Sequence, residues 1–215
     1  MLRADLHVHT HYSIDSASQL EQIIERCLEV GINCLAIADH NTITGALKLK
    51  VMAPFPIIVA EEIMTSSGEI IGLFLGEEIP SKLPVEEAIA QIKAQNGLVC
   101  IPHPYDTFRL SRLKNRLFET IMPQVDIVEV FNSRSLSSGN SYKAQQLANK
   151  YSKLVSAGSD AHTPSEIGHA YIEMPEFSEK DDFLQSLAQG KIIGHRSNPL
   201  VHFASTWAKL RKRPS

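Results

Sequence analysis

The stretch Cys34-Leu-Ala-Ile-Ala-Asp-His40 is a short apolar run that ends in two polar side chains. A run of this length, apolar throughout, is typical of a parallel strand that is buried on both faces. Helical periodicity precedes it in Ser18–Val30, whose apolar residues recur every three or four positions before Gly31. Similar apolar runs recur along the chain and also end in acidic or histidine residues: Pro56–Glu62, Leu98–His103 and Leu154–His162.

The order of these elements predicts an α/β fold. Strands that alternate with helices form a parallel sheet with right-handed crossovers, either open and doubly wound or closed into a barrel. An open sheet has its site at one switch point, whereas a barrel gathers side chains from the carboxyl ends of many strands. Acidic and histidine residues follow most of the apolar runs here, so we expect a compact or distorted (β/α) barrel. The other expected helices are Pro84–Gln95, Ser111–Ile121, Gly139–Ser152 and one near Glu179–Gln189.

His7 and His9 lie two residues apart, before the first expected helix. Alternate residues of a strand face the same side, so this pair can bind one metal ion. Later histidines and carboxylates extend the set of candidate ligands to His7, His9, Asp15, His40, Glu62, His103, Asp160 and His162. One ion cannot use so many donors, so we expect two or three ions that share bridging carboxylates. Imidazole and carboxylate donors without thiolate favour zinc, manganese or iron over calcium.

Several of these residues have ordinary structural alternatives. Only one of Glu61 and Glu62 can face the site if both continue a strand, because neighbouring side chains point to opposite faces. Asp15 could instead cap the helix that follows it, since Asp is a favoured N-cap residue. His103 lies between two prolines and could be a turn histidine.

The expected chemistry is hydrolysis of phosphoester bonds. Adjacent divalent ions lower the pKa of a bridging water and neutralise charge on the attacking and leaving oxygens. A metal-bound hydroxide would then attack phosphorus, and His162, if it is not a ligand, could assist the leaving alcohol. Bound phosphate needs nearby cations, for which Arg134 is the first candidate, followed by Arg109 and Arg196. The candidate catalytic residues are Asp160, His162 and Arg134.

Length and composition set further bounds. A chain of 215 residues fits one domain over 1–215, in which about 195–215 form a C-terminal extension or closing helix. The net charge of −3 argues against a protein that coats long nucleic acid. The three cysteines show no C-x-x-C spacing, and we expect neither a leader peptide nor an apolar segment that spans a bilayer. These features predict a cytoplasmic protein with no membrane partner.

Several short motifs follow one another in a specific order. They are His7-Val-His9-Thr10, Ala38-Asp39-His40-Asn41, Glu62, Pro102-His103-Pro104 and Ser159-Asp160-Ala161-His162, and they cover the chain from Leu6 to about Ile167. In this order they resemble the PHP family, which is named for its polymerase and histidinol phosphatase members. The resemblance implies a distorted seven-stranded (β/α) barrel and a phosphoesterase site that holds two or three divalent ions.

The resemblance also implies how the ligands divide among three metal positions. The first position would use His7, His9, Glu62 and Asp160, the second Glu62 and His103, and the third Asp15, His40 and His162. The chain departs from the fullest family pattern at two places, because Asn132 and Glu69 stand where relatives have histidines. Either residue could substitute as an oxygen ligand, or the second ion could bind weakly.

We therefore expect a metal-dependent hydrolase that cleaves phosphoester bonds of a small phosphorylated metabolite or nucleotide. One alternative is a nuclease or phosphodiesterase that acts on short oligonucleotides. Another is a non-catalytic metal-binding module, against which the number of donors argues, because a structural zinc site is closed by four ligands. Sequence alone leaves the oligomeric state open.

Overall fold

A nine-stranded mixed sheet, curved into a nearly closed barrel, forms the centre of the computed structural model, which describes residues 1–107, 109, 111–198 and 200–212. Its order is β7-β6-β5-β4-β3-β2-β1-β8-β9. The strands are β1 Leu2–Val8, β2 Cys34–His40, β3 Ile57–Thr65, β4 Gly68–Leu73, β5 Leu98–Ile101, β6 Ile127–Asn132, β7 Leu154–Gly158, β8 Ala170–Met174 and β9 Lys191–Gly194. The predicted barrel-like α/β fold is confirmed.

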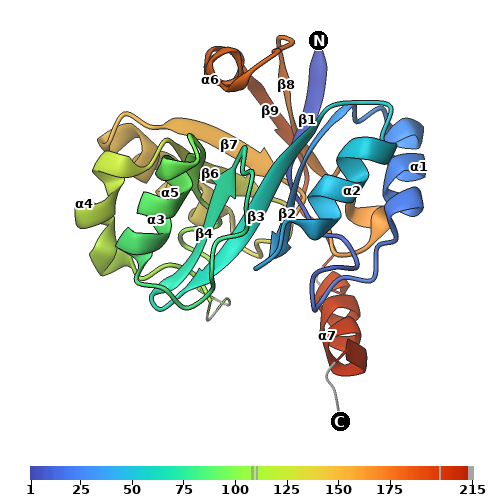
Figure 1. Ribbon diagram of the computed structural model, residues 1–215, viewed down its shortest axis with the longest axis horizontal. Helices are drawn as coiled ribbons and strands as arrows, with labels where there is room; N and C mark the ends of the chain where they lie inside the picture. The colour runs from blue at the N-terminus through green and yellow to red at the C-terminus, as the bar shows by residue number, and fades with distance from the viewer. Residues whose placement is uncertain (108, 110, 199, 213–215) are drawn as a thin grey trace.

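Helices surround this sheet (Figure 1). They are α1 Leu20–Val30, α2 Thr44–Met52, α3 Val85–Ala94, α4 Phe118–Ile121, α5 Ser138–Lys150, α6 Lys180–Ala188 and α7 Val201–Lys212. The prediction of a helix over Ser111–Ile121 was wrong for most of that segment, which holds only a short 3-10 turn at Asn115–Leu117 and then α4. Among the described residues, no helix is both long and apolar enough to cross a bilayer.

The α2 helix was not predicted, because its apolar residues are not confined to its buried face. Ala46 and Leu49 are buried, yet Leu47, Val51 and Met52 on the same short helix are exposed. Apolar residues therefore occur on all its sides, so the segment has no clear period of 3.6. Within the expected C-terminal extension, α7 begins at Val201, and residues 199 and 213–215 lie outside the described part of the chain.

The sheet departs from the expected all-parallel arrangement at β4 and at β8. The turn between β3 and β4 is too short for a helical crossover, so the two strands form an antiparallel hairpin. Because β4 runs in the opposite direction, its first residues lie at the same edge as the last residues of β3. This direction brings Glu69, near the start of β4, opposite Met64 on β3.

Strand β1 closes the barrel with two different partners. Its first residues pair with β8, where Leu2 lies opposite Met174. Its last residues meet the segment that follows β7, because the amide of Asp160 donates to the carbonyl of His7 at 2.7 Å and the amide of His9 donates to the carbonyl of Ala161 at 2.9 Å. The β7 end of the sheet therefore meets β1 at the place where the candidate ligands of both segments, His7, His9 and Asp160, lie.

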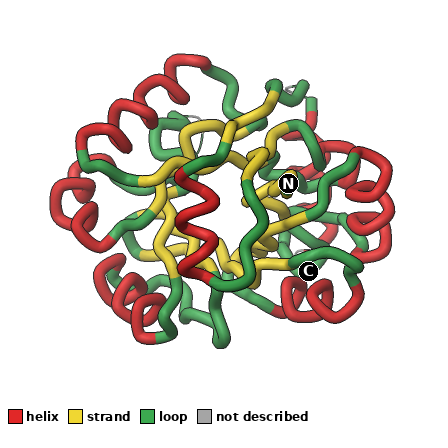
Figure 2. Tube along the Cα trace, turned by 90° about the horizontal axis from the view of Figure 1, so that it is seen from above, coloured by secondary structure: helices red, strands yellow, loops and turns green. Residues whose placement is uncertain are grey.

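The barrel interior is narrow because small side chains line it. On β2, Cys34, Ala36 and Ala38 belong to the interior cluster, and on β3 Ala60 does so. The opposite end of the barrel is closed by α6, whose Phe183 is fully buried in the same cluster. In Figure 2 this helix lies across the strands, while the other helices lie around the rim. Because side chains alternate along a strand, the next inward residues are His40 on β2 and Glu62 on β3. They point into the other, open end of the barrel, which we call its mouth.

Candidate metal centre

Glu62 lies at the centre of the cluster of candidate ligands. It is on β3, opposite His40, in the last residue pair that β3 makes with the parallel strand β2. Its Oε2 is 3.5 Å from the Nε2 of His7, 3.5 Å from the Nε2 of His9 and 3.3 Å from the Nδ1 of His40. Its Oε1 is 3.0 Å from the Nε2 of His103. Four rings thus surround one buried carboxylate, which is the arrangement that a bridging ligand requires.

Glu61, the neighbour of Glu62, points to the outside of the barrel. It is buried there, and its Oε2 accepts a hydrogen bond from the amide of Ile79 at 2.8 Å. Strand alternation therefore places only Glu62 in the mouth, as the sequence predicts.

Asp160 approaches His9 and His7 from the segment that closes the barrel. Its Oδ1 is 3.3 Å from the Nε2 of His9 and 3.8 Å from the Nε2 of His7. Its Oδ2 accepts a hydrogen bond from the side-chain amide of Asn132 at 3.0 Å and pairs with the guanidinium of Arg109. The backbone of Asp160 has a φ of +55°, in the left-handed region that Asp tolerates better than most residues. Only one edge of this carboxylate therefore faces the histidines.

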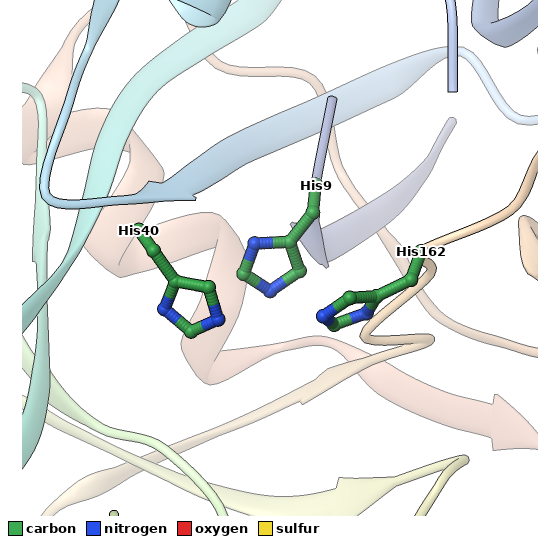
Figure 3. Close-up of side chains that lie close together, drawn as sticks. All are labelled: His9, His40 and His162. Carbon is green, nitrogen blue, oxygen red and sulfur yellow. The ribbon is translucent and has the colours of Figure 1, made fainter. Parts of the chain in front are cut away.

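Asp15 lies between His40 and His162. Its Oδ2 is 3.3 Å from the Nε2 of His40, and its Oδ1 is 3.3 Å from the Nε2 of His162. The ring of His9 lies 4.7 Å from that of His40 and 4.3 Å from that of His162, centroid to centroid (Figure 3). The alternative that Asp15 caps the following helix was wrong, because the N-cap of α1 is Gln19.

Opposite charges are balanced inside the cluster. Burial opposes a positive charge on His7, but the carboxylates of Asp160, Glu129 and Glu62 outweigh it and raise the pKa of His7 well above its ordinary value. Burial likewise opposes a charge on His40, yet Glu62 and Asp15 raise the pKa of His40 to about 10. Carboxylates that hold protons on these rings can hold divalent cations in their place.

The pKa of His9 moves in the opposite direction from those of His7 and His40. Burial, together with the neighbouring His162, lowers the pKa of His9 to about 3. A neutral imidazole is the form that binds a metal ion. The Nδ1 of His9 lies 3.1 Å from the hydroxyl of Ser13, which orients the ring so that Nε2 faces Glu62 and Asp160.

Two further observations indicate that this set of donors can bind divalent metal ions. Ligand atoms lie within 4.8 Å of one another in four groups: His9, His40 and His162; His7, Glu62 and His103; His7, His9 and Asp160; and His40, Glu62 and Glu69. In addition, the Oε2 of Glu62 and the Oδ1 of Asp160 are buried without a hydrogen-bond partner among the described residues. Such oxygens are costly unless a cation satisfies them. The structure thus brings every predicted ligand to one mouth.

Glu129 is a member of the site that sequence reasoning missed. Its Oε1 is 3.0 Å from the Nδ1 of His7, and its Oε2 accepts hydrogen bonds from the amide of His103 at 2.8 Å and from the side-chain amide of Asn132 at 3.0 Å. Glu129 thus orients two candidate ligands from behind. A lone carboxylate inside the apolar strand Ile127-Val-Glu-Val-Phe131 was the available signal.

Replacing Glu129 with Gln should weaken metal binding by about 10- to 100-fold, the usual effect of losing a group that orients a ligand. The amide removes the charge that pairs with His7 and leaves one acceptor oxygen for the three groups that contact the carboxylate. Equilibrium dialysis against Mn²⁺ measures the change. Glu119→Gln, on the exposed surface of α4, is the matched control and should bind Mn²⁺ as the wild type does. Equal affinity in both variants would contradict the role of Glu129.

Glu69 and Asn132 are the two expected departures from the family pattern, and the structure distinguishes them. The Oε1 of Glu69 is 3.8 Å from the Nδ1 of His40, so this carboxylate can join the ligands. Asn132 has its amide nitrogen on Glu129 and Asp160, and its Oδ1 accepts a hydrogen bond from the amide of Arg134 at 3.0 Å. Its contacts are those of a residue that holds a ligand in place.

The three arginines predicted to contact phosphate lie in different surroundings. Arg109 lies nearest to the cluster, because it pairs with Asp160 and its NH1 is 3.5 Å from the Nε2 of His103. Arg134 is buried, and its Nε is 3.4 Å from Glu166. Arg196 donates to the carbonyl of Ser135.

A cleft of about 590 Å³ opens beside the cluster. Asp15 and His162 line it together with Arg109 and Arg134. Helix α7 supplies a further part of the wall through Phe203, Ser205, Thr206 and Lys209. A cleft of this size suits a small ligand, and its cations favour an anionic one.

Comparison with known proteins finds relatives over most of the chain. A family model described as PHP-associated (PHP_C) matches residues 140–192. The chain is 41% identical over 187 residues to an uncharacterized protein of Methanocaldococcus jannaschii, an alignment that covers 85% of this chain and 75% of that protein. A second uncharacterized protein of the same organism is 41% identical over 145 residues, which are 61% of this chain and 82% of the relative.

Solved structures share the fold at low sequence identity. One is a two-domain protein of Bacteroides vulgatus that contains a predicted PHP-like metal-dependent phosphoesterase, with a TM-score of 0.73 and 15% identity over 90% of this chain. This chain spans 65% of that protein, slightly less than two thirds. Another is an amidohydrolase of Chromobacterium violaceum with bound sulfate, with a TM-score of 0.64 and 17% identity over 89% of this chain and 97% of that one.

Proposed function

The chain belongs to the PHP family, and on this premise we propose that it hydrolyses phosphoester bonds of a small phosphorylated metabolite or nucleotide. The fold is that of metal-dependent hydrolases of this family. The single observation that carries the proposal is the convergence of four histidine rings on the buried carboxylate of Glu62. A structural metal site would be closed by four ligands, whereas these donors extend beyond one ion's shell.

Bound divalent ions, of which we propose two or three, would supply an activated water and neutralise charge on the phosphoryl oxygens. Glu62 would bridge the first two positions, with His7, His9 and Asp160 on one side and His103 on the other. Asp15, His40 and His162 would form the third position. Two of these residues, Asp15 and His162, line the cleft beside the cluster, which would leave room for the leaving group.

Arg109 is proposed to bind the phosphoryl group. Its guanidinium lies at the edge of the cluster, on the wall of the cleft, and a planar fork of donors matches phosphate oxygens. The role of Arg134 in catalysis stays a prediction.

A substrate panel tests the proposed function. Protein loaded with Mn²⁺ would be assayed against an aryl phosphate, sugar phosphates, histidinol phosphate, nucleotides, an aryl phosphodiester and short oligonucleotides. We expect turnover of phosphate monoesters, and loss of that turnover in Asp160→Asn. Absence of phosphate release from every compound, at full metal loading, would overturn the proposal. An aryl amide in the same panel would detect an amidohydrolase activity instead.

Arg109→Met should lower kcat/KM for phosphate monoesters by about 10- to 100-fold, since a hydrogen bond to a charged group contributes about 1.5–3 kcal/mol. Weaker inhibition by inorganic phosphate, at unchanged metal content, would show that binding of the anion is what the variant lost. Arg26→Met is the control, because Arg26 pairs with Glu29 on the outer helix α1. Equal kinetics in both variants would argue against the assignment.

Cleavage of short oligonucleotides is a second candidate, which one observation favours. A further cleft of about 590 Å³ is lined by Thr107, Arg109, Arg112, Lys114, Asn115 and Arg116, and its cations could follow a phosphate backbone. It shares Arg109 with the cleft beside the cluster. Faster turnover of oligonucleotides than of mononucleotides in the panel would favour this candidate.

A further inference from the structure

Helix α7 is attached at both of its ends, through cationic side chains, to segments that carry candidate metal ligands. At its first turn, the NH2 of Arg134 donates to the carbonyl of Val201 at 3.1 Å and to the hydroxyl of Ser205 at 2.9 Å. At its last turn, the side chain of Lys212 extends away from the helix and contacts the segment 11–16. The helix itself lies at the edge of the molecule opposite α6 (Figure 1).

The Arg134 end is joined to the segment that carries Asp160 and His162. The NH1 of Arg134 lies 3.5 Å from the carbonyl of Asp160, and its Nε lies 3.4 Å from the Oε1 of Glu166. The other oxygen of Glu166 accepts a hydrogen bond from the amide of His162 at 3.1 Å. Arg134 therefore connects α7 with the backbone on which two candidate ligands stand.

The Lys212 end is joined to the segment that carries Asp15. The ammonium of Lys212 donates to the carbonyls of His11 at 2.5 Å, Ser13 at 2.6 Å and Ser16 at 2.6 Å. A lysine ammonium has three hydrogens, so these acceptors use all of them. The carbonyls flank Asp15 on both sides in sequence, and one cation thus fixes the curvature of the segment that presents this carboxylate.

Further hydrogen bonds hold this segment on both sides of Asp15, among them two made by serine hydroxyls. The hydroxyl of Ser13 bonds to Asp39 at 3.0 Å, and that of Ser16 bonds to the carbonyl of His162 at 3.0 Å. Among the described residues, the ion pairs of Asp15 are those with His40 and His162. Without Lys212, the three carbonyls would lose the hydrogen-bond donor that they share, and the backbone on both sides of Asp15 would be held by fewer contacts.

We propose that α7 acts as a clamp that sets the third metal position, with Lys212 as a positioning residue for Asp15. The inference rests on the metal-dependent function proposed above. Arg134 joins one end of the helix to the His162 segment and Lys212 joins the other end to the Asp15 segment. The helix thus adds a second connection between the segments that carry these two ligands, beside the direct hydrogen bond from Ser16 to the carbonyl of His162. Binding of the third ion therefore depends on the C-terminal helix.

The test compares Lys212→Met with Arg211→Met in the full chain. Arg211 is the preceding residue, and it lies over the ring of Trp207 at 5.0 Å, on the exposed side of α7. Titration with Mn²⁺, followed by calorimetry and by metal analysis, should show one class of site weakened by about 10- to 100-fold in Lys212→Met, as for the loss of a group that orients a ligand. Arg211→Met should bind as the wild type does. Amide hydrogen exchange of residues 11–17 should be faster in Lys212→Met only.

Failure of this inference can be told apart from failure of the proposed function, because neither readout needs a substrate. Equal metal binding and equal exchange in the two variants would overturn the clamp, whatever the enzyme hydrolyses. A wild type that releases no phosphate, while Lys212→Met alone loses a metal site, would overturn the proposed activity and support the clamp.

Discussion

Glu62→Gln should lower kcat/KM for a phosphate monoester by about 10³-fold, the upper range seen when one preorganised electrostatic group is removed from an active site. The carboxylate contacts His7, His9 and His40 through Oε2 and His103 through Oε1, so its two oxygens could be shared between two ions. An amide of the same shape carries no charge, so it cannot offset two divalent cations. Metal content should fall together with activity, and both are measured on the same sample.

Glu61→Gln provides a matched control for this substitution. It makes the same chemical change one residue away, but its side chain faces outward and bonds the amide of Ile79. An amide oxygen can accept that hydrogen bond, so Glu61→Gln should retain its metal and its activity. If the two variants lost activity equally, the loss would reflect damage to β3, and the assignment of Glu62 would fail.

Removal of divalent metal should lower the melting temperature by about 5–10 °C. A ligand that binds only the folded chain, at about 100 times its Kd, stabilises it by about 2.7 kcal/mol, and for a chain of this size each kcal/mol shifts the melting temperature by about 2–4 °C. The buried oxygens of Glu62 and Asp160 that lack hydrogen-bond partners among the described residues give the physical reason. Thermal scans with EDTA and with added Mn²⁺ measure the shift.

Two variants show whether this shift arises at the cluster. Glu62→Gln should lose most of the stabilisation by Mn²⁺, whereas Glu61→Gln should keep it. A melting temperature that is the same with EDTA and with Mn²⁺ in the wild type would mean that no ion binds tightly to the folded chain. The ligand assignments would then be wrong together.

Local pattern was sufficient to predict the strands that supply most of the donors. In Cys34–His40 and Pro56–Glu62, the apolar run gives the strand and its end gives the donor, because the carboxyl ends of parallel strands share one edge of a sheet. Strand alternation also showed that only one of Glu61 and Glu62 could face the site. These inferences need only neighbours in sequence, and the structure agrees with them.

Contacts between distant parts of the chain could not be predicted in this way. Glu129 lies in β6, whereas its partner His7 lies in β1 and its partner His103 follows β5, so its role depends on the register of the whole barrel. The antiparallel direction of β4 places Glu69 at the mouth, and the attachment of α7 through Arg134 depends on tertiary packing. Periodicity carries no information about such pairings.

The place where β1 meets the segment after β7 links the assembly of the fold to its chemistry. The amide of Asp160 donates to the carbonyl of His7, and these residues are 153 positions apart (160 − 7). Contacts between such distant residues are slow to form, because a long loop must close before they are made. The first metal position takes ligands from both of these segments. A chain in which β1 has not yet paired with the segment after β7 therefore has no complete site. Metal binding would therefore select fully folded molecules and report, in a refolding experiment, when the last closure has taken place.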